Sequence, residues 1–249
     1  MTVLVVSGTD TEIGKTVVTA AVAAAAAAAG RTVAVLKPAQ TGLAPGEEGD
    51  VAAAARLAGG VTAVELARFP EPLAPATAAR RAGMAPVAPA DVAEAARRLA
   101  ADHDLVLVEG AGGLLVRFDE EGGTLADAAR LLAASVLVVV RAGLGTLNTT
   151  ALTAEALRAR GVTAPGAVVG SWPATPDLAE RCNLADLPAV AGLPLLGAVP
   201  HGAGALAPAD FRAQSPGWLA PALGGRWDAA AFTARFAPQP CPSPLVRTA

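Results

Sequence analysis

Short, unbroken runs of Val and Leu recur along this chain, and longer stretches rich in Ala separate them. Leu4–Val6 and Val136–Val140 are two of these runs. A strand without polar alternation is covered on both faces, which is typical of parallel strands sandwiched between helices. The sequence therefore predicts an α/β fold with a doubly wound, mainly parallel sheet and helices on both faces.

The runs predict six strands, at Thr2–Ser7, Thr32–Lys37, Asp104–Glu109, Ser135–Arg141, Ala164–Ser171 and Pro194–Pro200. The stretches between them predict six helices, at Lys15–Ala29, Val51–Ala58, Pro89–Asp102, Thr124–Ala133, Asn148–Arg160 and Asp177–Ala191. The proline-rich segment Phe69–Pro89 indicates a structured loop with room for a short helix. Because ligands of such sheets bind beyond the carboxyl ends of the strands, residues at those ends are the first site candidates.

Length and composition favour one folded unit. The chain has 249 residues, of which 53% are hydrophobic and 16% charged, enough for a sizeable core. We expect a single domain over residues 1–237, followed by a Pro-rich, flexible tail over residues 238–249. The net charge of −3, without any basic run, argues against a nucleic-acid partner.

The sequence also predicts a cytoplasmic protein with no membrane partner. The apolar segment Val17–Gly30 is shorter than the roughly 20 residues that a spanning helix needs. No basic region or cleavage site follows Met1, so no signal peptide is visible. Cys182 and Cys241 are far apart in the chain, and free thiols suit a reducing cytoplasm. The sequence does not decide between free thiols and one disulfide that joins the two cysteines.

A phosphate-binding loop is the strongest motif. Gly8–Thr16, with the sequence GTDTEIGKT, follows an apolar strand and opens a helix. Its glycines let backbone N–H groups surround phosphates, and the helix amino end adds partial positive charge. Lys15 is placed to reach the β- and γ-phosphates, and the Thr16 hydroxyl suits Mg²⁺. Five residues instead of four separate the first glycine from the Gly-Lys-Thr, so the loop is one residue longer than usual.

Two carboxylates are candidates for the metal that accompanies a nucleotide. Glu109 ends an apolar strand and precedes the glycine-rich Gly110–Gly113, where backbone can approach a ligand closely. Asp50 begins a predicted helix, where it can act as a cap, as a metal ligand, or as both. The sequence alone leaves the role of Asp50 open.

Lys37 stands out because Lys15 and Lys37 are the only lysines in the chain. Both lie at predicted strand ends on the ligand side of the sheet. A compact ammonium is suited to a phosphate or to a developing carboxylate anion. We therefore predict that Lys37 is catalytic, together with Lys15.

These motifs occur together in a characteristic order. The long phosphate loop, Lys37-Pro38 with Thr41-Gly42, Glu109–Leu114 and Gly143–Asn148 together resemble the dethiobiotin synthetase family over about the first 200 residues, by motif order and spacing. The resemblance implies a P-loop NTPase-type fold and a homodimer active in biotin biosynthesis. It also implies a Mg²⁺-dependent ligase that converts 7,8-diaminononanoate, CO₂ and ATP into dethiobiotin, ADP and phosphate.

The resemblance also implies roles for individual positions. Lys37 would stabilise charge on a substrate carbamate, and Thr16, Asp50 and Glu109 would hold Mg²⁺. Substrate contacts are expected from Thr11, Lys37, Thr41, Gly145, Thr146, Leu147 and Asn148, the last four across a dimer interface. Nucleotide contacts are expected from Glu12, Ile13, Gly14, Lys15, Thr16, Val17, Asp50, Glu109, Gly110, Ala111, Gly112, Gly170, Ser171, Pro200, His201 and Gly202.

Two positions depart from the family pattern. Thr41 stands where many members have Ser, and the Thr side chain keeps the hydroxyl group of that position. Ser171 stands where members often have an Asn that reads adenine. A hydroxyl lacks the paired donor and acceptor of an amide. We therefore predict weak discrimination between nucleobases, with GTP or CTP accepted as well as ATP.

Three other functions fit the motifs less well. A P-loop switch protein of the deviant type, which controls membrane or DNA partitioning, would carry a second lysine early in the loop. This chain has Gly8, Thr9 and Asp10 there. An amidating enzyme of cobalamin synthesis would add a glutamine-hydrolysing domain, for which the chain has no space. An inactive homologue is disfavoured because every proposed catalytic position carries a competent residue.

Overall fold

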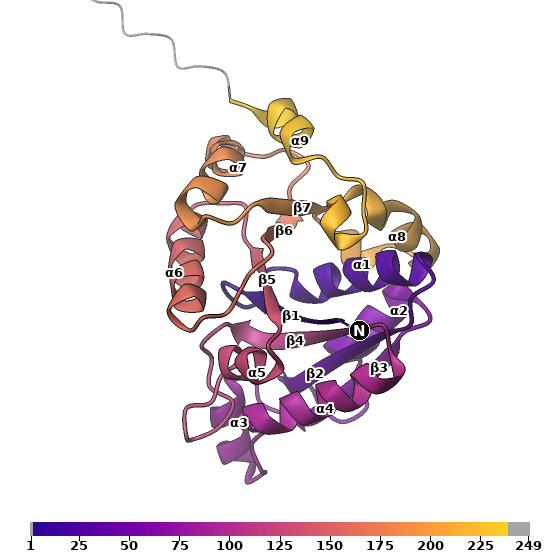
Figure 1. Cartoon of the computed structure of the whole chain (residues 1–249), viewed down its shortest axis with the longest axis vertical. Coiled ribbons are helices and arrows are strands. Elements are labelled where there is room, and N and C mark those ends of the chain that lie inside the picture. Colours follow the sequence, from indigo (N-terminus) through magenta and orange to yellow (C-terminus); the bar gives the residue numbers. More distant parts are fainter. Residues whose placement is uncertain (1, 239–249) are drawn as a thin grey trace, which may run out of the picture.

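The predicted parallel fold is confirmed. The computed structural model describes residues 2–238, so all of the predicted tail except residue 238 lies outside the described residues. Seven strands form one sheet in the order β3-β2-β4-β1-β5-β6-β7, and every neighbouring pair is parallel (Figure 1). The strands are β1 (Thr2–Gly8), β2 (Val33–Thr41), β3 (Thr62–Phe69), β4 (Leu105–Gly113), β5 (Ser135–Val140), β6 (Ala167–Trp172) and β7 (Leu195–Pro200).

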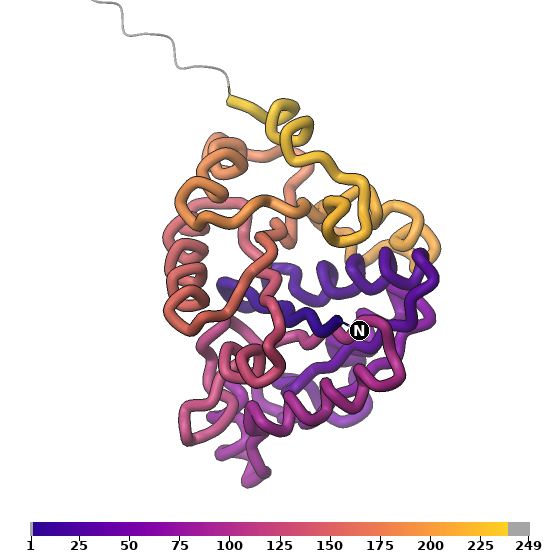
Figure 2. The backbone as a smooth tube through the Cα atoms, viewed as in Figure 1, coloured from indigo at the N-terminus to yellow at the C-terminus, as the bar shows by residue number. Residues whose placement is uncertain are grey.

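Nine α-helices connect and cover the strands within residues 2–238. They are α1 (Lys15–Ala28), α2 (Asp50–Ala58), α3 (Pro75–Ala82), α4 (Pro89–Asp102), α5 (Leu125–Leu132), α6 (Thr146–Ala159), α7 (Leu178–Ala191), α8 (Pro208–Gln214) and α9 (Ala229–Phe236). Figure 1 shows α1 and α4 on opposite sides of the sheet. Figure 2 shows that α1, near the amino end, runs beside the segment that carries α8, although the two are far apart in sequence.

The structure corrects several element boundaries. The prediction missed β3, an edge strand, together with α8 and α9, and α3 occupies the short-helix position within Phe69–Pro89. Strands β2 and β4 run to Thr41 and Gly113, so Lys37 and Glu109 lie inside them and not at their ends. Helix α6 begins at Thr146, two residues before the predicted start.

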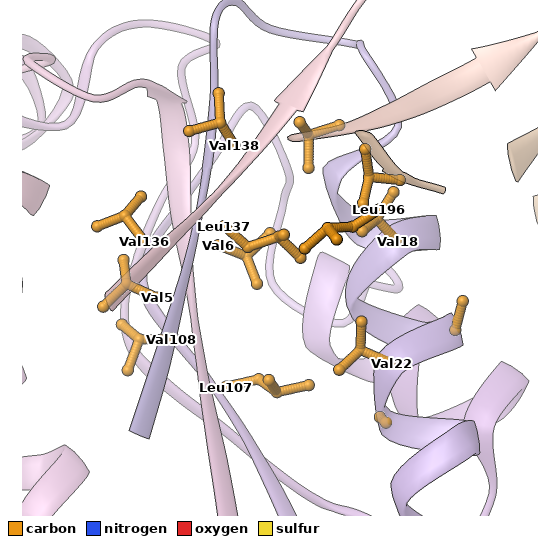
Figure 3. Packing of buried hydrophobic residues seen from close by; sticks show 14 of the residues in the cluster. Val5, Val6, Val18, Val22, Leu107, Val108, Val136, Leu137, Val138 and Leu196 are labelled. Carbon is orange, nitrogen blue, oxygen red and sulfur yellow. The ribbon is translucent and has the colours of Figure 1, made fainter. Parts of the chain in front are cut away.

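The core covers both faces of the sheet, and one part of it lies between α1 and the central strands. Figure 3 shows Val18 and Val22 of α1 near Val6, Leu107 and Leu137, which come from three neighbouring strands. Most of α1 is alanine, whose small side chain combines high helix propensity with close packing against the sheet. None of the helices formed by the described residues is long and apolar enough to cross a membrane.

Candidate functional site

The predicted phosphate loop lies where β1 passes into α1. Gly14 caps the helix in a left-handed conformation, with φ of 92°, which leaves the first N–H groups of α1 facing the loop. The Lys15 ammonium closes the loop by donating a hydrogen bond of 2.7 Å to the Asp10 carbonyl. The Asp10 carboxylate in turn pairs with Arg141, an exposed side chain that follows β5.

The far side of the loop touches β6 through backbone. A Cβ on Gly170 would overlap the Ile13 carbonyl, and a Cβ on Gly14 would overlap the Gly170 carbonyl. Ser171 follows directly, and its hydroxyl shares a hydrogen bond of 3.0 Å with Nδ1 of His201. Two of the predicted base-site positions therefore lie together, beside the phosphate loop.

Lys37 occupies a gap between two strands. The pairing of β2 with β4 ends at Leu36 and Val108, after which Pro38 removes one backbone donor from β2. The Lys37 ammonium enters the space so opened and donates to Oε1 of Glu109 at 3.0 Å and to the Gly110 carbonyl at 3.1 Å. Because β2 and β4 diverge after Leu36, the side chain of Lys37 in β2 can reach Glu109 and Gly110 of β4.

Four predicted residues meet at this point. The Lys37 ammonium lies 2.5 Å from Oδ2 of Asp50, which begins α2. The Thr16 hydroxyl, in the first turn of α1, donates to the same Oε1 of Glu109 at 2.9 Å. The loop, β2, α2 and β4 each contribute one side chain to this charged cluster.

The electrostatics of the two lysines differ. Burial disfavours the ammonium of Lys37, but the carboxylates of Glu109 and Asp50 outweigh burial and raise the pKa of Lys37 above its ordinary value. Burial, with repulsion from Lys37, lowers the pKa of Lys15 to about 8. Lys37 therefore stays protonated at neutral pH, whereas Lys15 loses its proton as the pH rises through about 8.

A cleft of about 920 Å³ opens above this cluster. The predicted residues that line it are Thr11, Glu12, Ile13, Gly14, Lys15, Thr16, Val17, Lys37, Thr41, Asp50, Glu109, Ala111 and Gly112. Gly110 contributes its carbonyl to Lys37 instead. The predicted residues outside its lining are Gly145, Thr146, Leu147, Asn148, Gly170, Ser171, Pro200, His201 and Gly202. The single chain thus brings together the phosphate and metal positions, and leaves the helix-α6 positions apart from them.

Several cleft residues were missed from the sequence. Gln40 lines the cleft, and its side-chain oxygen accepts a hydrogen bond of 2.8 Å from the Asp50 backbone N–H. Other parts of the cleft wall come from Leu43, Glu48, Val116 and Pro72–Pro75. The position of Gln40 within the Lys37–Gly42 motif was the available sequence signal. The other residues come mostly from loops whose approach depends on tertiary packing.

The donor set suits a magnesium ion. Thr16, Asp50 and Glu109 offer hydroxyl and carboxylate oxygens, the ligand type that Mg²⁺ prefers. Glu109 is fully buried, and its second oxygen, Oε2, has no hydrogen-bond partner among the described residues. A buried carboxylate oxygen without a donor is a costly arrangement, which a bound cation would relieve.

A phosphate loop at the amino end of α1, on a doubly wound parallel sheet, with a hydroxyl and carboxylates beside it, defines a P-loop nucleotide-binding protein. A family model described as an AAA domain matches residues 2–208. The MinC:MinD cell division protein complex of Aquifex aeolicus aligns with a TM-score of 0.56 at 15% identity, over 97% of this chain and 99% of that chain. At that identity the likeness shows the fold alone.

Two curated relatives narrow the class. The ATP-dependent dethiobiotin synthetase of Streptomyces avermitilis is 71% identical, over 96% of this chain and 100% of the relative. Its counterpart in Streptomyces coelicolor is 70% identical over the same shares of both chains. The chain belongs to the dethiobiotin synthetase family.

Proposed function

We propose that this protein closes the ureido ring of dethiobiotin, from 7,8-diaminononanoate, CO₂ and ATP, with release of ADP and phosphate, as a step of biotin biosynthesis in the cytoplasm. The observation that supports this most is the position of Lys37. Its permanent ammonium lies beside the phosphate loop, in a cleft large enough for a nucleotide triphosphate tail and a second substrate. A cation fixed there is placed to stabilise an anion that takes up a phosphoryl group.

The chemistry runs in three balanced steps. One substrate amine adds to CO₂ and loses a proton, which forms a carbamate. A carbamate oxygen then attacks the γ-phosphorus, so that ADP leaves and a carbamic-phosphoric anhydride forms. The second amine attacks the carbonyl carbon, loses a proton and expels phosphate, which closes the ring. In this scheme Lys37 stabilises the carbamate and the transferring phosphoryl group, and Lys15 binds the phosphates.

Thr16, Asp50 and Glu109 are the residues that would hold Mg²⁺, on the basis of their oxygen donors and the unpartnered Oε2. When bound, the ion supplies charge neutralisation at the β- and γ-phosphates. Thr11 and Thr41 line the same cleft and are proposed substrate contacts. The hydroxyls of Thr11 and Thr41 would orient the substrate, and the carboxylates of Glu109 and Asp50 keep Lys37 in place.

The proposed unit is a homodimer. Gly145–Asn148 form the amino end of α6, where free N–H groups suit a substrate carboxylate, yet they do not line the cleft of their own chain. Leu144, two residues before α6, is 87% exposed, and Leu152, within α6, is 57% exposed. Large apolar side chains so exposed favour a protein contact, and a second copy would bring Gly145–Asn148 to the partner's cleft.

The deciding assay incubates the protein with diaminononanoate, bicarbonate, Mg²⁺ and a nucleoside triphosphate, and detects dethiobiotin by mass. ATP, GTP and CTP are compared in parallel, and omission of the diamine is the control. Absence of dethiobiotin with all three nucleotides would refute the proposed activity.

Weak nucleobase selectivity is expected in the same assay. Ser171 and His201 share a hydrogen bond, and neither offers the adjacent donor and acceptor of an amide. The kcat/KM for GTP or CTP should equal or exceed that for ATP, and Ser171→Asn should shift the preference toward ATP. A wild-type preference for ATP of about a hundredfold, equivalent to about 2.7 kcal/mol, would contradict this.

Nucleotide binding is expected to take up about half a proton at pH 8, because the pKa of free Lys15 is about 8 and phosphates favour its charged form. The sign follows from the lowered pKa: affinity is full well below pH 8, is about halved at pH 8 and is about tenfold weaker at pH 9. Calorimetry in two buffers of different ionisation enthalpy measures the uptake. Lys15→Arg, which stays charged, should bind without uptake, and an equal uptake in that variant would assign the proton elsewhere.

A further inference from the structure

The segment 44–50 covers most of the connection between β2 and α2 and ends at Asp50, the first residue of α2. Asp50 is 35% exposed, whereas its partner Lys37 is buried. The position of the Asp50 carboxylate therefore depends on whatever holds the segment 44–50 against the sheet. The contacts that hold it come from Arg68 of β3, an edge strand away from the phosphate loop, from Gln40 of β2, and from an exposed ion pair between Arg56 of α2 and Glu48.

Arg68 of β3 binds both this segment and its own strand. Nη1 donates to the carbonyls of Ala44 at 3.2 Å and Glu47 at 2.8 Å. Nε and Nη2 donate to the two carboxylate oxygens of Glu65 at 2.7 Å and 2.9 Å. A bidentate pair fixes the plane of the guanidinium, so the remaining nitrogen points in a defined direction.

Gln40 holds the end of the segment. It is paired with Arg68 in the register of β2 and β3. Its oxygen accepts the Asp50 backbone N–H at 2.8 Å, and its nitrogen donates to the Thr41 carbonyl at 3.3 Å. The amide of Gln40 is thereby oriented, and it satisfies one of the free donors at the start of α2.

Gly49 packs directly on these side chains. A Cβ there would lie 2.6 Å from Nη2 of Arg68, 3.0 Å from Oε2 of Glu65 and 3.1 Å from Oε1 of Gln40. The backbone of Gly49 is extended, with φ of −87° and ψ of 174°, a conformation open to any residue. Glycine is therefore needed here for close approach and not for its conformation.

We propose that Arg68, oriented by Glu65, is a positioning residue for the reaction: it anchors the segment 44–50 so that Asp50 meets Lys37. Arg68 touches neither Lys37 nor the phosphate loop, and it acts through the backbone of the segment. The kinetic part of this inference rests on the proposed function, whereas its structural part does not.

The test compares Arg68→Ala with Arg98→Ala, a matched control. Arg98 forms an exposed ion pair with Glu94 on α4, so both variants lose one arginine and one pair with Glu. Arg68→Ala should speed backbone amide exchange of the segment 44–50 by about tenfold in nucleotide-free protein, because its carbonyl anchors are lost. It should also lower kcat by about tenfold or more while changing the KM for the diamine less than about threefold.

Arg98→Ala should leave both the exchange and kcat within about twofold of wild type, because exposed ion pairs contribute little. Arg68→Lys should behave like Arg68→Ala, because an ammonium cannot reproduce the bidentate fork. Unchanged exchange in Arg68→Ala, or faster exchange with wild-type kcat, would overturn the proposal. If Arg68→Ala does not fold, as judged by thermal unfolding, then Arg68→Lys and Gly49→Ala decide by the same two measurements.

If the wild-type protein makes no dethiobiotin, the proposed function fails. The amide-exchange measurement alone then tests whether Arg68 anchors the segment 44–50. Faster exchange in Arg68→Ala with unchanged exchange in Arg98→Ala then supports it. Equal exchange in both variants refutes it.

Discussion

Lys37→Gln is expected to lower kcat by about a thousandfold, a loss typical for a group that stabilises developing charge. Lys37 is the buried cation that bonds Asp50 and Glu109, and a neutral amide cannot supply its charge. Steady-state kinetics measures the effect. Nucleotide affinity should stay within about threefold of wild type, because Lys15, and not Lys37, is the proposed phosphate ligand. A near-normal kcat would remove Lys37 from its proposed role.

The same substitution also threatens stability. It leaves the fully buried Glu109 without its cation, and breaking a buried pair costs about 3–5 kcal/mol. The double variant Lys37→Gln with Glu109→Gln removes the uncompensated charge. It should recover most of the lost thermal stability without any recovery of kcat. Recovery of both would mean that Lys37→Gln fails through folding and not through chemistry. Arg98→Gln, which loses an exposed cation, is the control for charge.

Gly170→Ala is expected to weaken nucleotide binding by about a hundredfold. A Cβ at this position would overlap the Ile13 carbonyl and lie 2.6 Å from Cγ1 of Val139. Because Ile13 contributes backbone, the phosphate loop itself must move to make room. Overpacking of this kind costs about 1–3 kcal/mol, and about 2.7 kcal/mol corresponds to a hundredfold change in affinity. Titration calorimetry with a nucleoside triphosphate measures the loss.

Gly217→Ala is the matched control for this prediction. A Cβ on Gly217 would meet nothing within 4 Å, and its φ lies outside the left-handed region. Both variants therefore add one methyl group, but only one of them adds it against the phosphate loop. Gly217→Ala should bind nucleotide as the wild type does. Equal affinity in the two variants would show that contact between the loop and β6 does not shape the nucleotide site.

The sequence predicted the phosphate loop and most strands because their signals are local. Gly8–Thr16 carries its own glycine spacing, and unbroken Val and Leu runs mark strands that are covered on both faces. Strand β3 escaped because it lies at the edge of the sheet and is only partly buried, with Glu65 and Arg68 among its residues. A half-exposed edge strand with charged residues gives a weak hydrophobic signal.

The candidate site divides in the same way. Lys37 and Glu109 could be chosen from the sequence because each directly follows an apolar run, whereas the metal role of Asp50 was implied by the family resemblance. Their mutual contact could not be predicted in this way, since it depends on β2 parting from β4 after Leu36. Gln40 and Arg68 were overlooked because their partners are backbone groups of a loop whose path no sequence pattern specifies.

What the sequence determined by itself is the parallel α/β architecture and the residue types of the proposed phosphate and metal site, because both follow from short-range spacing. What only the tertiary structure decided is which of those residues meet. The ammonium of Lys37 between two carboxylates, the backbone contact of Gly170 with the loop, and the anchoring of Asp50 all join segments far apart in the chain. Such contacts arise from strand order and packing, which local patterns do not encode.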